Sequence, residues 1–127
     1  RQILSAVAEA GPVATELTRS ALAESFIQLG AALIRRNLPR CAEMAFQIAL
    51  AQREGQDLRP HRCLGELYFS QQRFWDAVAQ FEAILRGAPD DADAFRRLGD
   101  TYTQLGVADA ANLCYAQAEA SSPRSGT

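Results

Sequence analysis

The chain is 127 residues long, about the usual size of one domain, and its formal net charge at pH 7 is −2. All thirteen basic residues are arginine; residues 1–57 hold six of them against six acidic residues, and residues 58–127 hold seven against nine. Neither half offers the clustered basic surface of a nucleic-acid-binding protein. The fully apolar runs are far shorter than the ~20 residues of a membrane-spanning helix, so we expect no direct membrane insertion. The alanine-rich composition favours helices over strands.

The chain begins at Arg1 rather than at a methionine, and we therefore expect it to be part of a longer protein. Residues 2–10 are predicted to form a short helix that Gly11-Pro12 ends, because proline cannot continue a helix. The next helix is predicted at 23–37, and apolar residues in phase with it allow a start as early as Pro12. Apolar residues at helical spacing predict five further helices, at 39–53, 59–72, 74–87, 92–105 and 107–120.

A repeat of 34 residues organises these helices. One copy reads His61-x-x-Leu64-Gly65-x-x-Tyr68, Ala77-x-x-x-Phe81 and Pro89. The next copy reads Phe95-x-x-Leu98-Gly99-x-x-Tyr102, Ala111-x-x-x-Tyr115 and Pro123, with every feature 34 positions later. An earlier copy lies 35 positions upstream and reads Phe26-x-x-Leu29-Gly30-x-x-Leu33 and Ala42-x-x-x-Phe46.

This pattern resembles the signature of the tetratricopeptide repeat (TPR) family over residues 23–125. The resemblance implies an all-α fold, an α-α superhelix (TPR solenoid) of antiparallel helical hairpins. It divides the chain into a helical lead-in, three repeats and a short tail: 1–22, 23–57, 58–91, 92–125 and 126–127. It also gives a structural role to the residues of the repeat signature: Leu29, Gly30, Ala42, Leu64, Gly65, Tyr68, Ala77, Phe81, Pro89, Leu98, Gly99, Tyr102, Ala111, Tyr115 and Pro123.

The glycines of the repeat stand in the middle of helices, where glycine costs ~1 kcal/mol relative to alanine. A cost that recurs at a fixed period needs a reason. We expect a close approach of the paired helix, with Ala77 opposite Gly65 and Ala111 opposite Gly99. Asp90 and Asp91 are expected to place negative charge at the start of the following helix, where the helix dipole favours it.

The residues with catalytic or metal-binding chemistry are few and scattered. Cys41, Cys63 and Cys114 have no C-x-x-C spacing, and His61 is the only histidine, whereas a zinc site needs four clustered ligands. His61 and Cys63 are two residues apart and point to different sides of a helix, so we expect no Cys-His pair. Lone cysteines are most often small buried apolar residues. The sequence predicts no enzyme activity, no metal and no cofactor.

A second stripe on the first helix of each repeat faces away from the paired helix. In TPR proteins the corresponding residues line the concave face that contacts the ligand, so the resemblance implies a partner-binding groove of Ile27, Ala31, Ile34, Arg59, Arg62, Glu66, Phe69, Arg96, Arg97 and Asp100. The large apolar members mark an interaction site; the alternative is packing between adjacent repeats. We expect Arg62 to pair with Glu66, and Arg96 with Asp100, as i, i+4 pairs. Such pairs disfavour capture of a peptide's terminal carboxylate.

The resulting hypothesis is a cytoplasmic scaffold or adaptor that binds a segment of a partner protein. A complementary ligand would present two or three large apolar side chains followed by acidic ones. Three alternatives stay open: a bacterial secretion-type chaperone, a self-association module that forms a homodimer, and a regulatory domain of a larger protein.

Overall fold

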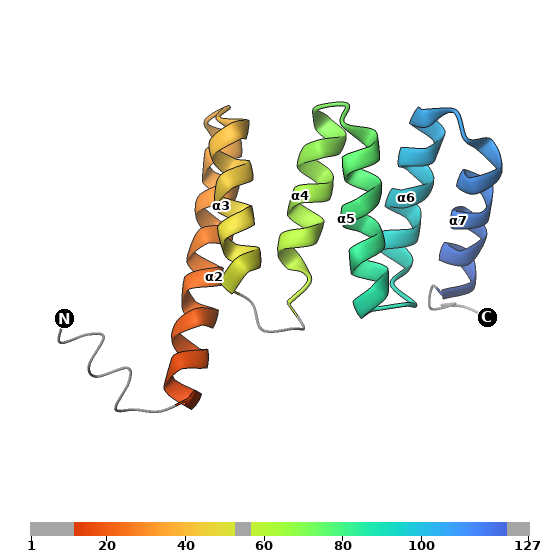
Figure 1. Ribbon diagram of the computed structural model, residues 1–127. Coiled ribbons are helices and arrows are strands. Elements are labelled where there is room, and N and C mark those ends of the chain that lie inside the picture. Colours follow the sequence, from red (N-terminus) through yellow and green to blue (C-terminus); the bar gives the residue numbers. More distant parts are fainter. Residues whose placement is uncertain (1–11, 53–56, 122–127) are drawn as a thin grey trace, which may run out of the picture. The chain divides into compact units, whose positions relative to one another are not determined.

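The computed structural model describes the chain at residues 12–52 and 57–121. The regular secondary structure of these residues is entirely helical: α2 (Pro12–Arg35), α3 (Pro39–Gln52), α4 (Arg59–Ser70), α5 (Phe74–Gly87), α6 (Ala92–Leu105) and α7 (Ala108–Ser121) (Figure 1). The all-α prediction is confirmed, and the helix bounds agree with the predicted ones to within two residues except at the first. That helix begins at Pro12, the earlier of the two expected starts. The short helix predicted at 2–10 lies outside the described residues.

Three tight turns fold these helices into hairpins, and all three use the same backbone geometry. Asn37, Gln72 and Gly106 each adopt a left-handed conformation, with φ of 61°, 62° and 80°. In each turn the next amide donates to a carbonyl five residues earlier: Leu38 to Leu33 at 2.9 Å, Arg73 to Tyr68 at 2.8 Å, and Val107 to Tyr102 at 2.9 Å. This bond closes the preceding helix and reverses the chain. Only the third turn has a glycine, the residue that adopts this conformation at least cost.

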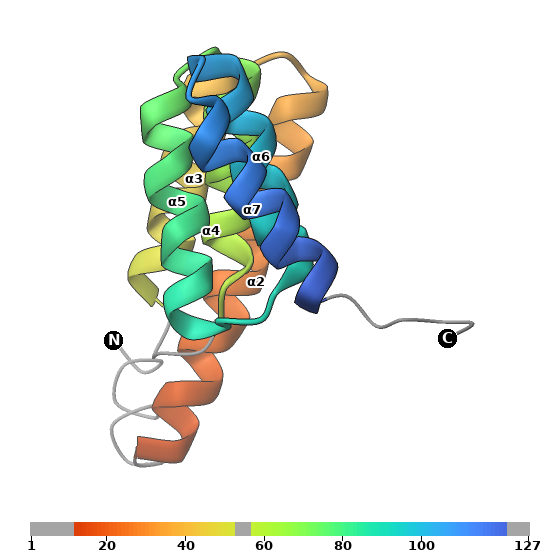
Figure 2. The ribbon, with the colours of Figure 1, turned by 90° about the vertical axis from the view of Figure 1, so that its right-hand side faces the viewer.

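The chain forms two compact units, at residues 1–60 and 61–127, and each is described by itself. In the first unit α2 packs against α3. In the second, α6 packs against both α5 and α7 (Figure 1), and the view from the α7 side shows α7 lying over α6 (Figure 2). The first unit buries Phe46, and the second buries most of the other large apolar side chains: Leu64, Leu67, Tyr68, Val78, Phe81, Ile84 and Leu98.

An aromatic ring packed on a glycine holds each hairpin together. A methyl group added at Gly65 would lie 2.6 Å from Cε1 of Phe81, and one added at Gly99 would lie 2.7 Å from Cε1 of Tyr115. Gly30 meets its own partner, Phe46, in the same way. The predicted close approach is therefore confirmed, but the expected partner was wrong. The ring sixteen residues ahead fills the space, and not the alanine twelve residues ahead, because a flat ring needs the room that a missing Cβ leaves.

A leucine and the cysteines also differ from their expected places. Leu29 is 46% exposed, whereas its counterpart Leu98 is 4% exposed. The reason is that α6 has a neighbour on each side, α5 and α7, while α2 packs against α3 within its unit. Cys41 is exposed on α3, contrary to the expectation of buried cysteines, and Cys114 is half-buried. Burial raises the pKa of the Cys114 thiol, which favours its protonated form.

Candidate functional site

The ten residues predicted to line a binding groove fall into two sets. The first unit holds Ile27, Ala31, Ile34 and Arg59, and the second holds Arg62, Glu66, Phe69, Arg96, Arg97 and Asp100. The second set lies on α4 and α6, and ion pairs across these elements involve Arg62, Glu66 and Arg97, which form the centre of the candidate site.

In the first unit, Ile27 and Ala31 are half-buried on α2, and Ile34 is 44% exposed. Arg59, the first residue of α4, donates hydrogen bonds to both Asp57 and Glu24. The bond from Arg59 lowers the pKa of Glu24, and the bonds to Asp57 and Glu24 raise the pKa of Arg59. The charge of Arg59 is thus already shared by two carboxylates of its own unit.

In the second unit, ion pairs link α4 to α6 and to the residue before it. Nη2 of Arg62 lies 2.8 Å from Oδ2 of Asp91, and Nη1 lies 3.6 Å from Oδ2 of Asp93. Nη2 of Arg97 lies 3.1 Å from Oε2 of Glu66. These five side chains are called the charged face below. The predicted pairing of Arg62 with Glu66 along one helix is wrong: each finds its partner across the hairpins, because α6 brings opposite charges alongside.

Asp91 is the member of the charged face whose place the sequence predicted only in part. It stands at the start of α6, where negative charge was expected, and it is the N-cap: its Oδ1 accepts from the amide of Ala94 at 3.1 Å. Its second oxygen holds Arg62, 29 residues earlier in the sequence. The structure leaves Nη1 of Arg62 buried without a hydrogen bond, although Asp93 stands 3.6 Å away. The available signal was the repeat register, which places Arg62 in the first turn of one repeat and Asp91 before the first turn of the next.

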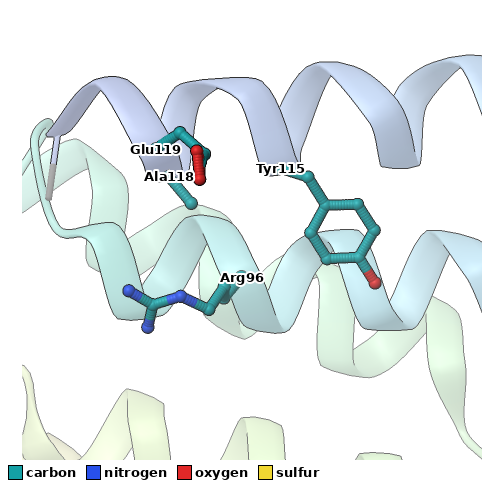
Figure 3. A pocket seen from close by; sticks show the side chains of 4 residues that line it. All are labelled: Arg96, Tyr115, Ala118 and Glu119. Atoms are coloured by element: carbon teal, nitrogen blue, oxygen red, sulfur yellow. The ribbon is translucent and has the colours of Figure 1, made fainter.

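Arg96 and Arg97 point to different sides of α6, although both were assigned to one groove. Arg97 reaches Glu66 on α4. Arg96 pairs with Asp93 one turn earlier, at 2.9 Å, and lines a hollow of about 260 Å³ between α6 and α7 together with Tyr115, Ala118 and Glu119 (Figure 3). Consecutive residues stand about 100° apart around a helix, which separates the two side chains.

The remaining members of the second set contact the hairpin partners of their own helices. Phe69 is half-buried and meets the ring of Phe74 edge to face, with centroids 5.3 Å apart. Asp100 accepts from the hydroxyl of Tyr115 at 2.6 Å, so the predicted pair of Asp100 with Arg96 is wrong. This hydrogen bond raises the pKa of Tyr115. Phe69 and Asp100 therefore support the hairpins of their own helices.

The other candidate for chemistry is His61. It is buried on α4, and its Nδ1 lies 2.8 Å from Oε1 of Gln80 on α5. An amide partner fixes the ring between two helices, in keeping with the packing role expected for this position. Within residues 12–52 and 57–121, no group of three or more His, Cys, Asp and Glu side chains is arranged to hold a metal ion. None of the helices in these ranges is both long and apolar enough to cross a lipid bilayer.

No model of a known protein family matches this sequence, and a search of curated proteins finds no match either. The geometry of the charged face and of the neighbouring hollow is therefore the ground for a functional proposal.

Proposed function

We propose that this chain is a helical-repeat module of the tetratricopeptide type, and that it binds a segment of a partner protein along the charged face. The 34-residue signature supports the first part, and so do the three like turns and the three glycine–aromatic contacts. Repeated hairpins of this kind present extended surfaces suited to chain-like ligands.

One observation carries the second part: ion pairs between hairpins hold the arginines of the charged face in place. Arg62 is held by Asp91, and Arg97 by Glu66. An arginine that is already ordered loses less rotamer entropy when a ligand binds, and its planar group keeps further N–H donors for carboxylate or carbonyl oxygens. Arginines and aromatic rings are frequent anchors of protein interfaces, and the half-buried Phe69 lies on α4, the helix that carries Arg62.

The balance of charges on the charged face restricts the kind of ligand that fits it. Two arginines stand among three acids, namely Glu66, Asp91 and Asp93, so a purely acidic segment would be repelled as well as attracted. The proposed ligand is therefore a segment with charges of both signs and one or two apolar side chains, rather than an acidic tail.

The test uses a charge-reversed pair. Partners are first recovered with the full-length protein, and the recovered partner is then titrated against variants of this chain. The double variant Glu66→Arg/Arg97→Glu keeps an ion pair between the same helices but exchanges its direction. We expect it to stay folded and to bind at least tenfold more weakly, about 1.4 kcal/mol. Arg40→Glu, an exposed change on α3, is the matched control and should bind normally.

Circular dichroism of each variant separates lost binding from lost fold. If the charge-reversed pair binds as well as the parent while Arg40→Glu binds poorly, the partner uses another surface and the proposal is wrong.

A further inference from the structure

The hollow beside Arg96 has a filled counterpart one repeat earlier in the same unit. Its lining residues are Arg96, Tyr115, Ala118 and Glu119 (Figure 3). The residues 34 positions earlier are Arg62, Phe81, Ile84 and Leu85. At that earlier place α6 packs against α5, and Phe81 and Ile84 are fully buried. The chain itself therefore shows which kind of element fits such a surface, namely a helix.

The earlier place also shows which charge fits. The incoming helix, α6, brings Asp91 as its N-cap, and this carboxylate serves two groups at once. One oxygen caps the helix at the amide of Ala94, and the other lies 2.8 Å from Arg62. Behind the cap, Ala94 and Leu98 are buried on the inner side of α6. The pattern of a fitting helix is thus an acidic N-cap, a small residue three positions later and a leucine seven positions later.

We propose that the hollow docks the first two turns of an amphipathic helix from a partner protein, with an acidic N-cap on Arg96 and small or apolar side chains against Tyr115 and Ala118. This site lies toward α7, whereas the charged face lies toward α4; Asp93 contacts both, through Arg96 and Arg62. The inference goes beyond the function proposed above and does not depend on it.

Two observations favour a carboxylate from another molecule as the partner of Arg96. Arg96 pairs with Asp93 of its own helix, and the two side chains are 50% and 64% exposed. An exposed pair of this kind contributes only ~0–1 kcal/mol, so a better-placed carboxylate can replace it. The residues 34 positions after Asp91 and Asp93 are Ser125 and Thr127, so the chain carries no acid at either matching position.

Glu119 gives the site a specificity that the earlier hairpin does not have. It takes the place of Leu85 and lines the same hollow as Arg96. Its negative charge opposes the acid of an incoming helix. Glu119→Gln should therefore bind such a helix more tightly than the parent does, by about twofold or more, whereas Arg96→Gln should bind it more weakly.

The test uses a peptide copy of the helix that fits the earlier place. The probe is residues 89–106 of this chain, with both ends blocked, titrated into the isotopically labelled full chain and followed by amide NMR shifts. We expect saturable shifts centred on Arg96, Tyr115, Ala118 and Glu119. A control peptide carries Asp91→Asn and Asp93→Asn, which remove the charges but keep a good N-cap, since asparagine caps helices as well as aspartate does.

We expect the effect of the Arg96 substitution on binding to depend on the charge of the peptide. Arg96→Gln should weaken binding of the acidic peptide at least fivefold and leave the asparagine peptide nearly unaffected. Arg86→Gln, an exposed change on α5, is the matched control and should change neither affinity by more than about twofold. Because Arg96 is half exposed, these variants should have the melting curve of the parent.

Four results would overturn the proposal. They are no saturable shift, equal affinity of parent and Arg96→Gln, shifts centred instead on Phe81 and Ile84, and concentration-dependent shifts at the hollow without any peptide. The third result would mean exchange with the chain's own α6, and the fourth would mean that a second copy covers the surface. None of these results bears on the charge-reversed pair of the charged face, so the two proposals can fail separately.

Discussion

The glycine–aromatic contact can be tested by comparing two glycines of the second unit that differ in how far their rings can move. An alanine at Gly65 would place its Cβ 2.6 Å from a carbon of Phe81, and an alanine at Gly99 would place it 2.7 Å from a carbon of Tyr115. The overlaps are nearly equal. The surroundings of the two rings differ, because Phe81 is fully buried, whereas Tyr115 is half-buried and lines the hollow.

The free energies follow from two opposing effects. Alanine is favoured over glycine inside a helix by ~1 kcal/mol, and overpacking of a tight core costs typically ~1–3 kcal/mol. At Gly65 the ring of Phe81 has no room to yield, so we expect Gly65→Ala to lower the free energy of unfolding by about 1–2 kcal/mol. At Gly99 the ring of Tyr115 can move toward the hollow. The helix preference for alanine and the overpacking then nearly cancel, so we expect Gly99→Ala to leave the free energy of unfolding almost unchanged.

The assay is urea unfolding followed by the fluorescence of Trp75, the only tryptophan, which lies in the second unit, together with circular dichroism. Phe81→Leu makes room for the new methyl group. The double variant Gly65→Ala/Phe81→Leu should therefore be more stable than the sum of the two single changes predicts, by about 1 kcal/mol. A rise in stability for Gly65→Ala, or additivity within about 0.3 kcal/mol, would refute the account of this contact.

Four further changes test the turns, the cap and the alkaline limit of stability. Gly106→Ala should cost about 1 kcal/mol, because an L-residue pays for the left-handed conformation, whereas Gln72→Gly should be neutral or stabilising by up to about 1 kcal/mol; both are read from urea midpoints. Asp91→Ala should cost about 1–2 kcal/mol through the lost cap and should free the amide of the first turn of α6 for faster hydrogen exchange. The hydrogen bond with Asp100 raises the pKa of Tyr115. The stability that this bond adds is therefore present below the ordinary pKa of tyrosine, about 10, and is lost as pH rises through the folded-state pKa. Tyr115→Phe should remove part of this alkaline decline, as read from urea midpoints.

The sequence by itself determined the helices and the hairpins. Apolar spacing and the proline positions predicted the described helices, because helix formation depends on local periodicity and on residues that cannot continue a helix. The 34-residue register predicted that Gly65 and Gly99 play one role, and it placed Asp91 at the start of a helix. These are properties of a few neighbouring residues, which the chain order alone makes visible.

Only the tertiary structure decided which side chains meet across helices. The partner of Gly65 is Phe81 and not Ala77, because the fit depends on the shape of the ring and the depth of the helix crossing. Arg62 pairs with Asp91 and not with Glu66, because the packing of α6 brings the carboxylate of Asp91 closer to Arg62 than the carboxylate on the next turn of α4. Electrostatic partners follow distance in space, and periodicity along one helix carries no information about the helix that packs beside it.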